Sequence, residues 1–261
     1  MAGSTPRSVS RAAVVAKEGL DEARARLEAI ARESGVELVD TDAELAVVLG
    51  GDGTIIRSLA RLLGTGVPVI GVNFGRVGFL ASMGPEDMDA GLRRAFAGEL
   101  RVLELPTLEV EVDGKRRVAV NDVVASSSTI GRMVELAWSV GGEELGVQPC
   151  DGIICATPSG STAYNLSSGG PVLVWGLDAM AVTFVSPHSL DARPLVVPRG
   201  LDLEVCNRSH DATAAVIADG QEVGELGSSA RAVVRLGEQR SLLAMLPEQT
   251  FFRRYRDTFA S

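Results

Sequence analysis

Histidine, cysteine and aromatic residues are scarce in this sequence of 261 residues. The three cysteines form no Cys-x-x-Cys pair and no even set, so neither a disulfide framework nor a thiolate zinc site is indicated. A Ser-His-Asp triad would have only His188 and His210 to draw on. Aromatic residues make up 4% of the chain, so the core must rest on Val, Leu, Ile and Ala.

Long apolar runs and a positive net charge are also missing. No run approaches the roughly 20 apolar residues that a membrane-spanning helix needs. Residues 1–10 are small and polar, unlike a secretory signal, so a cytoplasmic location is expected. The net charge of −9 argues against a general nucleic-acid surface, which needs a basic face. It still allows a small anionic ligand, held by backbone amides and local arginines.

Strand and helix patterns alternate over the first hundred residues. Short apolar runs predict strands, and longer segments with apolar residues at helical spacing predict helices. This order implies a parallel sheet with helices on its faces. We therefore expect residues 1–98 to form an α/β, Rossmann-like nucleotide-binding domain, with strands at 12–16, 45–49 and 67–72 and helices at 18–33, 54–63 and 85–97.

The pattern changes after Gly98. Short runs rich in Val, Leu and Thr recur about every ten residues, separated by Asp-Gly, Gly-Gly and Pro. They predict a β-rich, sandwich-like domain over residues 99–242. The tail, residues 243–261, has aromatic residues at helical spacing, and we expect it to pack back on the first domain. The predicted strands of the second domain include 107–112, 133–140, 181–185, 201–206, 213–218 and 231–236.

A glycine turn, Gly50-Gly51-Asp52-Gly53-Thr54, lies between a buried strand and a helix. This is the crevice at the carboxyl end of a parallel strand, where open α/β sheets bind ligands. Glycine permits a positive φ and a close approach to phosphate, and the helix N-terminus attracts an anion. The turn is neither a Walker A loop nor a Gly-x-Gly-x-x-Gly fingerprint. Asp52 would repel a phosphate unless it handles a hydroxyl proton or a magnesium ion. The alternative is that Asp52 only caps the helix.

The second unusual segment runs from Asp151 to Pro171. A short apolar strand leads into a turn crowded with hydroxyl groups and small residues. Such a loop suits ribose, adenine edges and amides, because it offers many donors and acceptors with little bulk. A flexible linker is the alternative, but a linker does not explain the interleaved Pro158, Tyr164 and Leu166.

These segments resemble a known family. The glycine turn is similar to that of a kinase group that includes NAD kinases, diacylglycerol kinases, sphingosine kinases and, with variation, phosphofructokinases. The segment 151–171 resembles the long signature of the NAD kinases in particular. Shorter elements follow the order of that family: Gly71 to Leu80, Asn121-Asp122, Ser186 to Leu190 with Arg193 to Leu195 after it, and Asp219-Gly220-Gln221.

The resemblance implies an enzyme that transfers the γ-phosphoryl group of ATP to the 2′-hydroxyl of the adenosine ribose of NAD, making NADP. It implies that Asp52 accepts the hydroxyl proton, and that magnesium arrives with ATP and not in a protein cage. It further implies a homodimer or homotetramer. The phosphates would be held by backbone amides of Gly51, Gly53 and Thr54, with Arg57 as a charge partner.

The resemblance also implies contacts with NAD. Asn121 and Asp122 would bind ribose hydroxyls, Phe79 would lie against adenine, and Arg132 would lie near the substrate. Asp151 would meet the nicotinamide end, while Ser186 and Gln221 would close the site. Both nucleoside pockets would be lined by Ser159, Thr162, Ala163, Tyr164, Asn165, Leu166 and Ser167.

One departure and two alternative functions stand beside this prediction. Many members of the family that this chain resembles have a basic residue where this chain has Pro149, so the substrate contact of that basic residue is not expected here. A lipid kinase of the diacylglycerol type would share the glycine turn, but it leaves the segment 151–171 unexplained. A non-catalytic NAD or NADP sensor would keep the fold without turnover, and the retention of Asp52 speaks against it.

Overall fold

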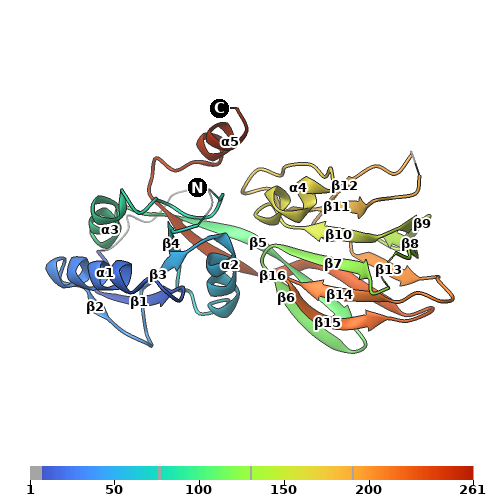
Figure 1. The fold of residues 1–261 in the computed structure, drawn as a ribbon, viewed down its shortest axis with the longest axis horizontal. Coiled ribbons are helices and arrows are strands. Elements are labelled where there is room, and N and C mark those ends of the chain that lie inside the picture. The colour runs from blue at the N-terminus through green and yellow to red at the C-terminus, as the bar shows by residue number, and fades with distance from the viewer. Residues whose placement is uncertain (1–7, 76–77, 130, 190, 261) are drawn as a thin grey trace. The chain divides into compact units, whose positions relative to one another are not determined.

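A computed structural model describes residues 8–75, 78–129, 131–189 and 191–260 (Figure 1). The chain folds into two compact units. The first contains residues 1–104 and 241–261, and the second contains residues 105–240. Among the described residues, no helix combines the length and the apolarity needed to cross a membrane.

The first unit is an α/β fold. Its sheet has the order β2-β1-β3-β4 and is extended by the end of β16, where Leu243 pairs with Val69. All of these neighbouring strands are parallel. The elements are β1 (Arg11–Ala16), α1 (Asp21–Glu33), β2 (Glu37–Leu38), β3 (Leu45–Gly50), α2 (Asp52–Arg61), β4 (Val69–Asn73), α3 (Met88–Phe96) and α5 (Phe251–Phe259).

Helices cover both faces of this parallel sheet. On one face, Ile70 and Val72 of β4 share a core with Leu27 of α1 and Leu92 of α3. Gly71 lies between Ile70 and Val72 in β4 and faces the opposite side of the sheet. A Cβ added to Gly71 would lie 2.3 Å from the Ile55 side chain of α2. Because successive residues of a strand face opposite sides, α2 packs on the second face. Both faces are therefore apolar, which explains the continuous apolar runs of β3 and β4.

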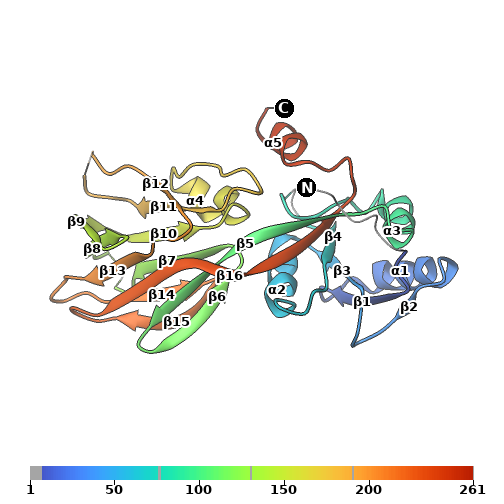
Figure 2. The same cartoon turned by 180° about the vertical axis from the view of Figure 1, so that it is seen from behind.

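The second unit contains two antiparallel sheets. One has the order β12-β11-β10-β7-β14-β15, and the other contains β16-β13-β8-β9 together with β5 and β6. Figure 2 shows β5, β6 and β16 side by side. The elements are β5 (Arg101–Val112), β6 (Lys115–Ala119), β7 (Asp122–Ser127), β8 (Val134–Val140), β9 (Glu143–Cys150), β10 (Gly152–Ala156), η1 (Gly160–Thr162), α4 (Tyr164–Ser167), β11 (Ala179–Val185), β12 (Leu195–Pro198), β13 (Leu203–Asn207), β14 (Ala214–Ala218), β15 (Gln221–Leu226) and β16 (Arg231–Met245).

One apolar core lies between these two sheets. Leu108 and Val134 from one sheet and Ile153, Met180 and Val216 from the other belong to the same buried cluster. Alternate residues along each strand supply this core, as in a β-sandwich. The predicted fold class, a parallel α/β unit followed by a β-rich, sandwich-like unit, is confirmed.

One strand is longer than the sequence pattern predicts. The predicted run ends at Leu236, whereas β16 continues through Gly237 and Glu238 to Met245. These two residues interrupt the apolar pattern and read as a turn. Glycine is required at 237 for a steric reason, because an added Cβ would lie 2.6 Å from Oγ1 of Thr107.

Candidate active site

The glycine turn of the first unit leads directly from strand to helix. β3 ends at Gly50, Gly51 is extended with φ −103°, and α2 already begins at Asp52. Gly50, Gly51 and Gly53 do not use a positive φ. Their value is steric instead: an added Cβ at Gly50 would lie 2.7 Å from Oγ1 of Thr54, while Gly51 and Gly53 face open space. An incoming group can therefore approach the backbone closely at both positions.

The Asp52 side chain is fixed by a neighbouring loop. Its carboxylate accepts the backbone N–H of Phe79 at 2.8 Å and that of Leu80 at 3.2 Å. No side chain caps α2, whose N-cap residue is Gly51, so the interpretation of Asp52 as a helix cap is wrong. Burial raises the pKa of the Asp52 carboxyl, against the opposing effects of these two amides and of the positive charge of Arg254.

Gly78 makes the approach of this loop possible. A Cβ at position 78 would lie 2.4 Å from the carboxylate of Asp52, so any larger residue would have to push that carboxylate aside. The close approach of Asp52 is a physical reason for the glycine at position 78, which belongs to the family-like element from Gly71 to Leu80. Arg76 and Val77 of that element lie outside the described residues.

Backbone amides at the start of α2 are available to an anion. Within the described part of the chain, nothing accepts a hydrogen bond from the amides of Asp52 and Gly53. The amide of Thr54, in contrast, donates to the Gly51 carbonyl at 2.9 Å. Arg57 lies one turn into the helix, with Nη2 3.5 Å from Oγ1 of Thr54. This helix N-terminus and its arginine can attract a phosphate.

In the second unit, Asp219 organises the Asn-Asp pair. Its carboxylate accepts the backbone N–H of Val120 at 2.7 Å, of Asn121 at 2.8 Å and of Asp122 at 3.2 Å. Sequence reasoning treated Asp219 only as part of a family element and missed this role. Asp219 lies in the turn between β14 and β15, with φ 47°. About a hundred residues of chain separate it from the three amides, so no local sequence pattern reveals the contact.

In the pair itself, Asn121 is buried and Asp122 is half-buried, and both side chains are unusual. Oδ1 of Asn121 has no hydrogen-bond partner within the described residues, which is costly unless a ligand supplies one. Burial, followed by the negative charge of Asp219, raises the pKa of Asp122 to about 6. Both features are typical of polar groups arranged for a ligand.

Thr157 and Ser159 hold the same segment from the other side. The Thr157 hydroxyl lies 2.7 Å from the Val120 carbonyl, and the Ser159 hydroxyl donates to that carbonyl at 3.1 Å. Gly160 then passes so close that an added Cβ would lie 2.1 Å from the carbonyl oxygen of Asn121. The structure thus brings the predicted residues Asn121, Asp122 and Ser159 together, and it adds Thr157.

The hydroxyl-rich turn that follows divides into structural and exposed residues. Asn165 is fully buried, donates to the carbonyls of Ser161 and Pro171, and accepts from Thr183. Tyr164, in contrast, is 44% exposed. The hydroxyls of Thr162 and Ser167 bond nearby carbonyls, Ala163 is exposed and Leu166 is half-buried. The internal bonds of Asn165 give it a structural task beside the predicted contact.

Several other predicted residues lie at the surface of the second unit. Arg132 forms an ion pair with Asp211, and Gln221 accepts a hydrogen bond from Arg117. Asp151 is exposed, and Ser186 has a positive φ of 45°. The backbone of His188 is tied to the Pro149 carbonyl, while Leu190 lies outside the described residues.

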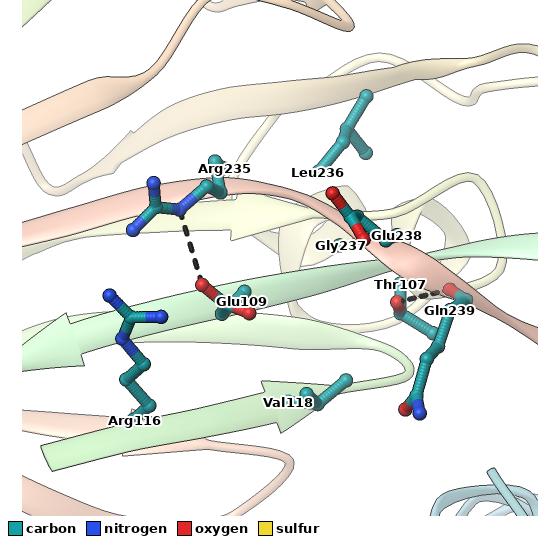
Figure 3. Close-up of a pocket in the computed structure, with 9 residues that line it drawn as sticks. All are labelled: Thr107, Glu109, Arg116, Val118, Arg235, Leu236, Gly237, Glu238 and Gln239. Atoms are coloured by element: carbon teal, nitrogen blue, oxygen red, sulfur yellow. Dashed lines mark hydrogen bonds and ion pairs between the residues drawn. The ribbon is translucent and has the colours of Figure 1, made fainter. Parts of the chain in front are cut away.

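A cavity of about 530 Å³ in the second unit contains none of the predicted residues (Figure 3). Its charged lining includes Glu109, Arg116 and Arg235, and the Arg235 guanidinium lies 3.3 Å from Glu109. The Thr107 hydroxyl donates to the Gln239 carbonyl at its edge. In addition, no group of three His, Cys, Asp or Glu side chains suited to a metal ion occurs among the described residues.

Comparison with known proteins identifies the family. Residues 3–100 match the ATP-NAD kinase N-terminal domain, and residues 120–245 match the ATP-NAD kinase C-terminal domain. An NAD kinase from Heliobacterium modesticaldum is 39% identical over 219 residues, which cover 82% of this chain and 77% of that protein. The chain belongs to the NAD kinase family. Another NAD kinase, from Gemmatimonas aurantiaca, is 37% identical over 235 residues, covering 86% and 80% of the two chains.

Two solved structures of NAD(H) kinases are also similar to this chain. An NAD kinase from Archaeoglobus fulgidus in complex with ATP has a TM-score of 0.79 and 29% identity, covering 94% of this chain and 98% of that one. A yeast NADH kinase complexed with NADH has a TM-score of 0.85 at 20% identity, covering 97% and 88%. At 20% identity, the similarity to the yeast enzyme shows a shared fold. The prediction of an NAD kinase, a phosphotransferase, is therefore confirmed over that of a lipid kinase.

Proposed function

We propose that this chain transfers the γ-phosphoryl group of ATP to the 2′-hydroxyl of the adenosine ribose of NAD, with Asp52 as the proton acceptor. A bond forms between the 2′-oxygen and the γ-phosphorus. The bond from that phosphorus to the β–γ bridging oxygen breaks, and ADP leaves with the electron pair. The hydroxyl proton passes to a carboxylate oxygen of Asp52. The products are NADP, ADP and a proton.

The observation that carries this proposal is the placement of Asp52. Its carboxylate is held by two backbone amides at the first residue of α2, beside amides that can bind phosphate. A carboxylate is a weak base for a hydroxyl, but a loose phosphoryl-transfer transition state demands little base strength. Fixed position and neutralisation of phosphate charge supply most of the rate.

NAD is bound in this proposal by the Asn-Asp pair of the second unit. The unpartnered Oδ1 of Asn121 accepts a hydrogen bond from a ribose hydroxyl, and Asp122 takes a second hydroxyl. The support is physical, since a buried amide oxygen without a partner costs free energy until a donor arrives. The other contacts predicted from the sequence stay predictions.

Three finer features complete the proposal: the cation and the assembly rest on the family resemblance, and the location rests on the polar residues 1–10. The donor is the magnesium complex of ATP, so the cation arrives as part of the substrate. The enzyme works in the cytoplasm, and it assembles as a homodimer or homotetramer. Sedimentation velocity of the full chain tests the assembly, because a single species at the monomer mass would contradict it.

The direct test measures NADP with a coupled, NADP-specific dehydrogenase. NAD with MgATP should give continuous NADP formation, and omission of magnesium should abolish it. Parallel reactions with polyphosphate in place of ATP, and with NADH in place of NAD, define the donor and acceptor. Folded protein that binds NAD but forms no NADP with either donor would reject the kinase and leave a non-catalytic sensor.

A further inference from the structure

The loop that holds Asp52 has no regular secondary structure of its own. Residues 78–82 follow β4 as an irregular segment, yet the amides of Phe79 and Leu80 must point at one carboxylate. An irregular loop keeps such a geometry only if other contacts fix it. At the end of this loop, Ser82 bonds the Gly71 carbonyl and the Leu246 amide. The contacts around Phe79 and Leu80 come from α5, the last helix of the chain, which belongs to the same unit.

The Arg254 side chain of α5 donates hydrogen bonds to two carbonyls of the loop, one before the Phe79 and Leu80 amides and one after them. Its Nη1 donates to the Gly78 carbonyl at 3.3 Å, and its Nη2 donates to the Ala81 carbonyl. A guanidinium is planar and presents its donors in a rigid fork, so two bonds fix the spacing of the two carbonyls. The Gly78 carbonyl belongs to the same peptide group as the Phe79 amide, and the Leu80 amide lies in the next peptide group, before the Ala81 carbonyl.

Aromatic packing holds α5 against the same loop. The Phe79 ring lies 6.2 Å from that of Phe251 and 5.6 Å from that of Phe259, measured between ring centroids. Phe79 is only 6% exposed. The helix itself is capped by Thr250, whose side chain accepts the backbone N–H of Arg253. These contacts place Arg254 where its fork reaches the loop.

Arg254 and Asp52 also interact electrostatically, because their charges are opposite. Burial lowers the pKa of the Arg254 guanidinium, while Asp52 and then Asp257 raise it. Arg253, the other charged neighbour, opposes them. The positive charge of Arg254 in turn favours the ionised form of Asp52, which is the form that can accept a proton.

We propose that Arg254 is a positioning residue for the phosphoryl transfer, because it fixes the Gly78–Ala81 loop whose amides hold the Asp52 carboxylate. This inference rests on the proposed function for its kinetic consequence. Its structural consequence, the ordering of the two amides, is independent of any activity.

The test compares Arg254→Gln with Arg253→Gln in the full chain. Both substitutions remove one positive charge from α5, but the Arg253 side chain makes an exposed ion pair with Asp257 and no hydrogen bond to the loop within the described residues. Arg254→Gln should lower kcat about 10- to 100-fold, because a small displacement of a reacting group has effects of this size. KM for NAD and for ATP should change less than about threefold. Arg253→Gln should leave kcat within about twofold of the parent.

Two further measurements separate positioning from general damage. The acidic limb of the kcat profile should move to higher pH in Arg254→Gln, since Asp52 loses a favourable charge, and Arg254→Lys should restore the limb but not the full kcat. Amide hydrogen exchange at Phe79 and Leu80, read by NMR without nucleotides, should speed up about tenfold or more in Arg254→Gln only.

The outcomes are distinct. Parent-like kcat, pH profile and amide exchange in Arg254→Gln would overturn the inference. If Arg254→Gln does not fold, Arg254→Lys decides, because an ammonium on a flexible stem lacks the rigid fork that fixes the spacing of the two carbonyls, and kcat should still fall. If the parent chain forms no NADP, the proposed function fails, and the exchange rates alone then support or reject the positioning role.

Discussion

Replacement of Asp122 by asparagine should make the protein more stable at neutral pH. Asp122 is half-buried, its side chain makes no hydrogen bond within the described residues, and the negative charge of Asp219 lies nearby. Its pKa is raised from 3.8 to about 6. Ionised Asp122 therefore opposes folding, and a neutral side chain of the same shape removes that cost.

The magnitude follows from the pKa. A tenfold change in proton affinity is about 1.4 kcal/mol, so a rise from 3.8 to about 6 lowers the unfolding free energy by about 3 kcal/mol above pH 7. The sign is that of a carboxyl that binds its proton more tightly when folded. Stability is retained below the unfolded pKa and is lost as pH rises from about 4 to about 6.

Urea unfolding without nucleotide measures this effect. Both tryptophans, Trp138 and Trp175, lie in the second unit with Asp122, so their fluorescence reports the relevant transition. Asp122→Asn should gain up to about 3 kcal/mol at pH 8 and less than about 0.5 kcal/mol at pH 3.5. The control is Asp113→Asn, at an exposed turn residue with φ 50° that asparagine tolerates. An equal gain at both pH values, or a loss at pH 8, would refute the reasoning.

Three more substitutions test the geometry. Gly78→Ala should lower kcat about tenfold or more by pushing the Asp52 carboxylate aside; Gly227→Ala, where a Cβ meets open space, should not, and equal effects would count against the steric argument. Asp219→Ala should lower the unfolding free energy in urea by about 1–3 kcal/mol, because three backbone amides lose their acceptor. Asn165→Ala should cost about 2–4 kcal/mol in the same assay through three lost internal hydrogen bonds; a change below about 0.5 kcal/mol in either variant would contradict its role.

Local patterns were sufficient to predict most elements of the fold. The apolar run at 45–49 became β3, and the helical spacing of the tail became α5. Boundaries moved where a residue's role depends on distant partners. α2 begins at Asp52, two residues before the predicted start at Thr54, and β16 passes through Gly237 because Thr107 leaves no room for a side chain.

The candidate site was less accessible to sequence reasoning. Asp52 could be singled out because a carboxylate in a phosphate-binding turn needs an explanation. Long stretches of chain separate Asp52 from the amides of Phe79 and Leu80 and from Arg254, which bonds their loop. These contacts therefore leave no local sequence pattern. Phe79, predicted to meet adenine, is packed against Phe251 and Phe259, a contact that only the fold reveals.

The Asp52→Asn variant tests the central claim most directly. Asparagine keeps the size of the side chain and one acceptor oxygen, but it cannot take a hydroxyl proton. Turnover of NAD with MgATP should fall at least about 100-fold, as is typical when a general base is lost. The dissociation constant for NAD, measured by calorimetry, should change less than about threefold. Turnover within a few fold of the parent, in folded protein that binds NAD, would contradict the assignment of Asp52 as the base.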